Sequence, residues 1–396
     1  MKKHVFSLST LLLSTLCLQA GGEYLLATPN SNPLEAEAEQ PSQMMPSFIE
    51  NINGYLRVGY QLNDKDRADL ALGGKLHFDT VQWHGLSVGA SFYTTNQIHQ
   101  NEGAEVPFFD ANQKSYSLLG ESYLRGTWGA TQLTIGRQEL DTPFADSDDI
   151  GMVPNTFEAY LLTNTSFTDT TITLGQIQKM AGVDATDPAH FEKLNNSDNV
   201  QTLGIAYASK SGLSLSSWYY NLTDATIESI AYVDGSFEGE VSGFSYLLGL
   251  QYAQEAYSQS SDDASIYGVN LEMGYAGVGF HVAYNQSNDN TADNGFGGGP
   301  FFTSAEFLTL AEGGKDAEAL LLGGSFDTSV IGIPHVTLTL NSLTLTDENS
   351  VDSDELDLGI TYEKRDFNIQ LIYSDVEDTI NNQSFENTRI FMNYLF

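Results

Sequence analysis

The last nine residues, 388–396, read T-R-I-F-M-N-Y-L-F and restrict the possible folds most strongly. Successive side chains of a strand point to opposite faces, so Ile390, Met392, Tyr394 and Phe396 would share one apolar face. A single strand with two open edges is not stable alone and must pair with other strands. Pairing with the first strand of the chain would close a barrel that has no edge left.

The same alternation of apolar and small or polar residues recurs along the chain. No apolar run of 18 residues follows the first twenty residues, so membrane-spanning helices are not expected. Strands that are apolar on one side are typical of transmembrane barrels, although a soluble sandwich alternates in the same way. The clearest of these segments are 54–62, 70–79, 267–275 and 278–285.

Connection lengths favour the membrane barrel. Tight turns, such as Gly129-Ala130 and Ala276-Gly277, alternate with long connections. Short periplasmic turns and long outer loops would produce this order. We therefore predict an all-β fold, a transmembrane antiparallel β-barrel of about 18 strands, with 16 left open because the segment 226–235 is the weakest strand. The long connections are 96–114, 139–156, 179–199 and 287–316.

The beginning of the chain is typical of exported proteins. Lys2 and Lys3 precede an apolar run and then small residues at 20–22, the order found in a secretory signal peptide. We expect a signal peptide over 1–20, a Pro- and Glu-rich periplasmic lead-in over 21–50, and the transmembrane barrel over 51–396. The single cysteine, Cys17, lies in the signal segment, so no disulfide or cysteine metal site is expected in the mature chain.

Charge and motifs narrow the class of function. A formal net charge of −36 excludes nucleic acid as a partner. The sequence contains none of the common catalytic or phosphate-binding motifs, so we expect no enzyme and no cofactor. The pair Asp148-Asp149 could attract Ca²⁺, but it lacks an ordered ligand loop and solvated carboxylates are the better interpretation, so no metal is expected.

Three stretches resemble the OprD family of bacterial outer-membrane porins. They are G-R-Q-E-L-D-T-P at 136–143, S-D-D-I-G-M-V-P-N-T-F-E at 147–158 and G-G-G-P-F-F-T-S at 297–304. The resemblance implies an eighteen-stranded barrel whose third and seventh outer loops, here 139–156 and 287–316, fold inward and narrow the pore. The implied constriction residues are Arg137, Asp141, Asp146, Asp148, Asp149, Pro300, Phe301 and Phe302.

The final strand also resembles the closing strand of outer-membrane barrels. In those proteins an aromatic ending serves as the signal for the barrel assembly machinery, and Tyr394 and Phe396 would supply it here. An ordinary edge strand that happens to end in phenylalanine is the alternative.

Alternation places four basic side chains toward the lumen: Arg57, Lys75, Arg125 and Arg389. On the lipid face a charge near mid-depth would cost about 2–4 kcal/mol, which favours the inward assignment. Arg57, Lys75 and Arg389 lie on strands that become neighbours when the barrel closes, so they could form a positive stripe opposite the acidic loop residues. The alternative is that these charges only solvate the lumen or hold the loops.

The resemblance implies passive, partly selective diffusion of small hydrophilic solutes such as ions, amino acids or other small carboxylates. We expect location in the outer membrane of a Gram-negative bacterium, contact with membrane lipid and lipopolysaccharide, and a monomer rather than a trimer. The scarcity of basic residues leaves the sign of ion preference open. The alternative function is an adhesin or surface receptor that acts through its long outer loops.

Overall fold

The computed structural model describes residues 48–63, 67–99, 107–194, 199–222, 226–258 and 262–396. The expected signal peptide over 1–20 and nearly all of the expected lead-in lie outside these residues. Within the described ranges, no helix has the length and apolar character needed to cross a membrane.

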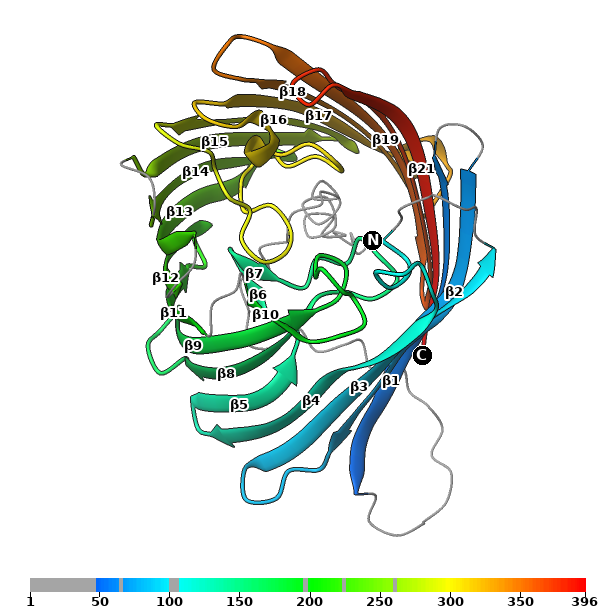
Figure 1. The fold of residues 1–396 in the computed structure, drawn as a ribbon, viewed down its shortest axis with the longest axis vertical. Helices are drawn as coiled ribbons and strands as arrows, with labels where there is room; N and C mark the ends of the chain where they lie inside the picture. Colours follow the sequence, from blue (N-terminus) through cyan, green and yellow to red (C-terminus); the bar gives the residue numbers. More distant parts are fainter. Residues whose placement is uncertain (1–47, 64–66, 100–106, 195–198, 223–225, 259–261) are drawn as a thin grey trace, which may run out of the picture.

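Within the described residues, eighteen antiparallel strands form one closed ring (Figure 1). This confirms the predicted fold class, and the weakest predicted strand is one of the longest, so the sixteen-stranded alternative is wrong. The strands are β1 (Ile49–Asn63), β2 (Arg67–Thr80), β3 (Leu86–His99), β4 (Tyr116–Trp128), β5 (Thr131–Gln138), β8 (Thr156–Asn164), β9 (Thr170–Ala181), β11 (Val200–Ala208), β12 (Leu213–Leu222), β13 (Ile227–Val241), β14 (Phe244–Tyr257), β15 (Ala264–Tyr275), β16 (Val278–Asn288), β17 (Glu318–Asp327), β18 (Val336–Thr346), β19 (Asp352–Lys364), β20 (Phe367–Asp378) and β21 (Gln383–Leu395).

Short elements occupy the connections. The two-residue strands β6 (Asp141–Thr142) and β7 (Ala145–Asp146) form a hairpin between β5 and β8. The two-residue strand β10 (Glu192–Lys193) adds to the upper end of β9. Two 3-10 helices, η2 (Leu310–Gly313) and η3 (Thr328–Ile331), flank β17.

The ring closes between the first and last strands. β1 pairs with β21 from Tyr55 opposite Leu395 to Asn63 opposite Asn387. Below this ladder, Gly54 and Phe396 each donate a backbone N–H to the other's carbonyl, at 3.0 Å in both directions. Because lipid offers no hydrogen bonds, closure satisfies backbone groups that would otherwise cost several kcal/mol each.

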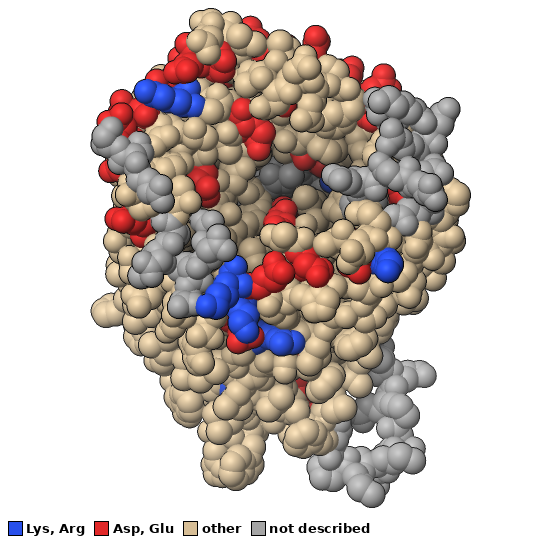
Figure 2. Space-filling view, viewed as in Figure 1, with Lys and Arg blue, Asp and Glu red and all other residues tan. Residues whose placement is uncertain are grey.

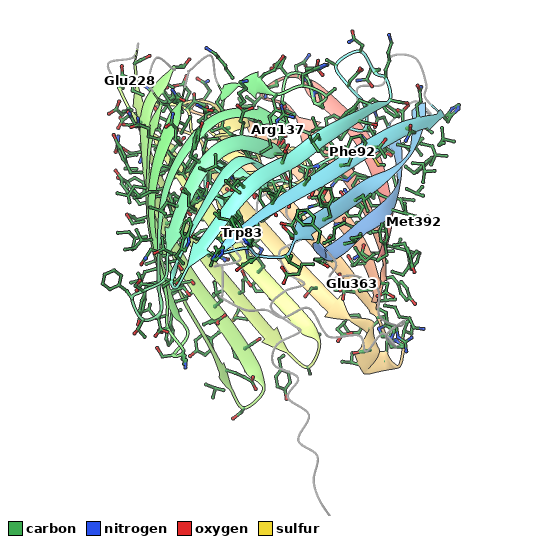
Figure 3. The ribbon with its side chains drawn as sticks, turned by 90° about the horizontal axis from the view of Figure 1, so that it is seen from below. Trp83, Phe92, Arg137, Glu228, Glu363 and Met392 are labelled. Carbon is green, nitrogen blue, oxygen red and sulfur yellow. The ribbon has the colours of Figure 1, made fainter. Side chains whose placement is uncertain are left out.

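Apolar side chains point outward along the wall. In β21, Met392 and Tyr394 are 41% and 50% exposed, whereas Phe391 and Arg389 are buried on the inner side. Figure 3 labels two of the outward side chains, Phe92 and Met392, on opposite sides of the seam. The apolar face therefore meets lipid and the polar face lines the lumen.

The outer connections are not all long, unlike the long outer loops expected from the sequence. Four are long, at 100–115, 139–155, 182–199 and 289–317, while the remaining outer connections take three to six residues. In one of these short turns, the side chain of Asp347 accepts the backbone N–H groups of Asn349 and Val351, each at 2.8 Å. Such side-chain caps close a hairpin locally and need no support from a long loop.

The close approach of β2 to Gly54 in β1 predicts that Gly54→Ala weakens the barrel. A Cβ at this position would lie 2.0 Å from the Lys75 carbonyl oxygen, so β1 and β2 would have to separate. We expect the free energy of unfolding to fall by about 1–3 kcal/mol, measured by urea titration of refolded protein.

Gly324→Ala in β17 is the matched control. A Cβ there would meet nothing nearer than the Gly279 carbonyl oxygen at 3.7 Å, an ordinary contact. Equal stability of the two variants would contradict the importance of the close approach at Gly54.

Candidate functional site

The loop 139–155 leaves the wall where β5 ends and crosses the inside of the ring (Figure 1). Phe144, at the tip of the β6–β7 hairpin, is fully buried. Its ring lies 5.7 Å from the rings of Tyr220 and Tyr232 on the inner wall and 6.1 Å from Phe301. Because apolar rings hold the hairpin, its position in the lumen is defined.

The loop 289–317 packs against the hairpin. Phe296 donates its backbone N–H to the Phe144 carbonyl at 2.9 Å, and Asp146 donates its N–H to the Phe296 carbonyl at 3.3 Å. The side chain of Gln251 on β14 donates to the Pro300 carbonyl at 3.1 Å and accepts the Phe302 N–H at 2.9 Å. The loop is thus held at both ends of the Pro300–Phe302 segment.

Arg57 on β1 holds the end of the loop 139–155. Its two terminal nitrogens donate to the two carboxylate oxygens of Asp149, each at 2.6 Å, and one also donates to the Gly151 carbonyl. Its Nε donates to Asn393 on β21, across the seam. A bidentate pair of this geometry fixes both position and orientation.

Lys75 on β2 lies at the centre of a second polar network. Its Nζ lies 2.8 Å from Glu121 on β4 and 3.0 Å from Glu139 at the start of the loop. The Tyr93 hydroxyl donates to Glu139 at 2.6 Å and lies 3.1 Å from Glu121. Two carboxylates therefore neutralise one ammonium and tie the loop to the wall.

The other two basic residues have different surroundings. Arg389 on β21 forms a short ion pair with Glu306 of the loop 289–317. Arg125 lies over the ring of Tyr123 at 4.5 Å, and its Nε is buried with no hydrogen-bond partner in the described part of the chain. The three stripe residues thus bind acids and do not present free positive charge.

A carboxyl pair joins three loops. Asp148 accepts the backbone N–H of Gly298 at 3.2 Å, and a hydrogen bond links its carboxyl group to Asp184. Asp184 also accepts the Asn155 amide at 2.6 Å. Burial and the nearby Asp184 and Asp146 carboxyl groups raise the pKa of Asp148 to about 8, so this carboxyl is protonated near neutral pH.

Arg137 lies outside the constriction, unlike the position expected from the sequence. It belongs to β5, where its register partners are Ser122 and Glu158, and it donates to the Leu119 carbonyl at 3.3 Å. Because Ser122 is exposed on the lipid-facing side, Arg137 faces outward. Of the other loop acids expected at the constriction, Asp141 is exposed and Asp146 is buried, and they pair in the β6–β7 hairpin.

Four residues of the site were not among those identified from the sequence: Glu121, Glu139, Glu306 and Asp184. Glu121 and Arg125 are four residues apart in β4, so alternation alone would have placed Glu121 on the lumen side. The positions of Glu306 and Asp184 depend on the paths of long loops, which carry no periodic signal.

Acidic groups dominate the mouth of the barrel. Figure 2 shows Asp and Glu side chains around the opening, with one group of Lys and Arg at its lower left. At the constriction, the cations of Arg57, Lys75 and Arg389 are matched by four carboxylates, those of Asp149, Glu121, Glu139 and Glu306.

The raised pKa of Asp148 predicts that the three-loop junction loosens as pH rises. An acid whose folded pKa lies above its ordinary value of 3.8 contributes most stability below that value and loses it up to about pH 8. We expect amide-exchange protection of residues 297–299, relative to intrinsic rates, to fall by up to about tenfold per pH unit in this window.

The uncharged Asp148→Asn variant should keep the acceptor for Gly298 and flatten this dependence. Hydrogen exchange followed by mass spectrometry at pH 5, 7 and 9 measures both proteins. Identical profiles would contradict a titrating junction.

The comparisons with known proteins agree with this geometry. A family model described as outer membrane porin, OprD family, matches residues 101–394. The fold is similar to the crystal structure of Pseudomonas aeruginosa OpdK with vanillate, with a TM-score of 0.77 and 16% identity over 88% of this chain and 99% of that one. It is similar to a BenF-like porin from Pseudomonas fluorescens Pf-5 (TM-score 0.78, 15% identity, 88% and 99% covered). It is also similar to Acinetobacter baumannii OccAB1 (TM-score 0.72, 16% identity, 88% and 97% covered).

No curated protein sequence matches the chain. The family match and the barrel support an outer-membrane channel for small solutes in a Gram-negative bacterium. The chain belongs to the OprD family of outer-membrane porins.

Proposed function

We propose that the barrel lets small hydrophilic solutes diffuse passively and that its constriction prefers cations to anions. The observation that carries this proposal is the pairing of every stripe cation with loop or wall carboxylates. Asp149 and Glu139 retain side-chain exposures of 47% and 37%, whereas Arg57 and Lys75 retain 6% and 17%. The solvent at the narrowing therefore meets more carboxylate than ammonium or guanidinium.

The opposed charges also act on neutral and dipolar solutes. Cations on the wall of β1, β2 and β21 face carboxylates on the two inner loops, so the field crosses the pore rather than running along it. A transverse field in a narrow site orients dipolar molecules such as amino acids. We infer that zwitterions and cations pass more readily than dicarboxylates.

The inward path of the loops supports a channel over an adhesin. Phe144 and Phe301 are buried in a cluster with the inner wall, so the loops that carry them do not project from the surface. An adhesin or receptor would use exposed loops to contact its partner.

Single-channel recording in a planar bilayer with a KCl gradient tests the proposal. Wild type should conduct, and the sign of its reversal potential should indicate cation selectivity. Asp149→Asn with Glu139→Gln should shift the reversal potential in the direction of anion selectivity, because the exposed carboxylates are removed. Arg57→Ala with Lys75→Ala should shift the reversal potential further in the direction of cation selectivity. Lys210→Gln in a periplasmic turn is the control and should not move it.

Each other outcome removes a specific part of the proposal. Conductance that is indifferent to all four constriction substitutions would keep the channel and discard the charge pairs as its selectivity device. A folded barrel without conductance would reject the channel and make the adhesin or receptor the leading function.

A further inference from the structure

The outer face of the wall carries a basic cluster that the channel does not use. We define it as Arg137 on β5, Lys179 on β9 and Lys193 on β10, together with Glu158 on β8. In the strand register Arg137 is opposite Glu158, Glu158 is opposite Lys179, and Lys179 is opposite Lys193. Three cations and one carboxylate thus follow one another across neighbouring strands on one face.

Glu158 neutralises Arg137 and Lys179 only weakly. Arg137 Nε and Lys179 Nζ both lie 3.9 Å from the same Glu158 oxygen, at the limit of an ion pair. Their side chains are 36% and 40% exposed. Since this chain has 16 basic and 52 acidic residues, three bases around one acid depart strongly from its average surface. Figure 2 shows Lys and Arg gathered over the ends of β5 and β9.

The cluster lies toward the outer leaflet. Lys179 is nine residues beyond the periplasmic start of β9 at Thr170, or about 30 Å along the strand. On a strand tilted by about 45°, that length brings Lys179 to a height near the upper edge of an apolar band about 25 Å tall. Figure 3 places Arg137 nearer the loop rim than Trp83, which belongs to the periplasmic turn between β2 and β3.

A groove adjoins the cations. Because β5 has only eight residues, it leaves the wall early, and Arg137 reaches up to the Leu119 carbonyl of the longer β4. The step encloses about 310 Å³. Leu119 of β4, which is 40% exposed, lines its top beside Arg137 and Glu158. Ile135 and Tyr160, the latter 45% exposed on the lipid side, line its lower part. The groove is apolar below and cationic above.

We propose that this groove and the basic cluster bind a phosphorylated glycolipid of the outer leaflet, one phosphate lying among Arg137, Lys179 and Lys193 and an acyl chain along Ile135 and Tyr160. A phosphate accepts several charge-assisted hydrogen bonds at once, which suits a cluster of three donors with a net positive charge. An apolar chain suits the groove below it. A soluble anion would satisfy the cations and leave the groove empty.

The proposal is independent of solute passage, because the cluster lies on the opposite face of the wall from the constriction. Arg137 also has a structural role, since it fills the step and lies 4.3 Å from the ring of Phe191. The test therefore keeps Arg137 and substitutes the two lysines.

Native mass spectrometry of refolded protein in detergent, titrated with bis-phosphorylated lipid A, tests the site. Wild type should retain one lipid at low ratios, and Lys179→Gln with Lys193→Gln should bind it about tenfold more weakly. Lys210→Gln with Lys364→Gln removes the same charge from periplasmic turns and should bind as wild type does. Heat-modifiable migration in gels checks that all three proteins are folded.

Two further titrations distinguish a lipid phosphate from free inorganic phosphate as the ligand. Lipid A without phosphates should bind as weakly as the double lysine variant, and inorganic phosphate at millimolar concentration should not displace the phosphorylated lipid. Equal binding of the dephosphorylated lipid, displacement by inorganic phosphate, or equal losses in both double variants would each overturn the proposal.

Discussion

The hydrogen bonding of the backbone in lipid is the constraint on which the rest of this structure depends. Every strand needs two neighbours, and β1 and β21 meet this requirement for one another at the seam. Once the ring is closed, the side-chain alternation determines which groups meet lipid and which meet water. The polar residues of all strands therefore line the lumen. The inner loops contact both apolar rings and charged side chains of this inner wall.

The two inner loops are held by different kinds of interaction. The tip of the loop 139–155 is fixed by a buried aromatic cluster around Phe144, while its two ends are tied to the wall by Glu139 and Asp149. The loop 289–317 depends on hydrogen bonds from Gln251 and on the ion pair of Glu306 with Arg389. Apolar packing thus sets where the loops lie, and charges set what the remaining opening attracts.

The fold was largely predictable, because period-two alternation is a local property that survives even in β13, the strand least clear from the sequence. Charge pairing was only partly predictable. Arg57 follows the alternation of β1, but its partner Asp149 is determined by the path of a loop. In β4 a bulge beside Gly120 interrupts the alternation, so Glu121 and Leu119 face opposite sides. Arg137 was placed wrongly because the motif at 136–143 continues past Gln138, the last residue of β5. The sequence therefore does not show where the strand ends and the loop begins.

The side chain of Gln251 has a consequence for how the pore responds to ionic strength. An uncharged amide is indifferent to dissolved salt, whereas the pair of Arg57 with the half-exposed Asp149 is weakened as the Debye length falls to about 3 Å at 1 M. Concentrated electrolyte would therefore loosen the Arg57–Asp149 end of the loop 139–155 more than the Gln251 contacts of the loop 289–317. The resistance of the opening would then not scale simply with the conductivity of the bathing solution.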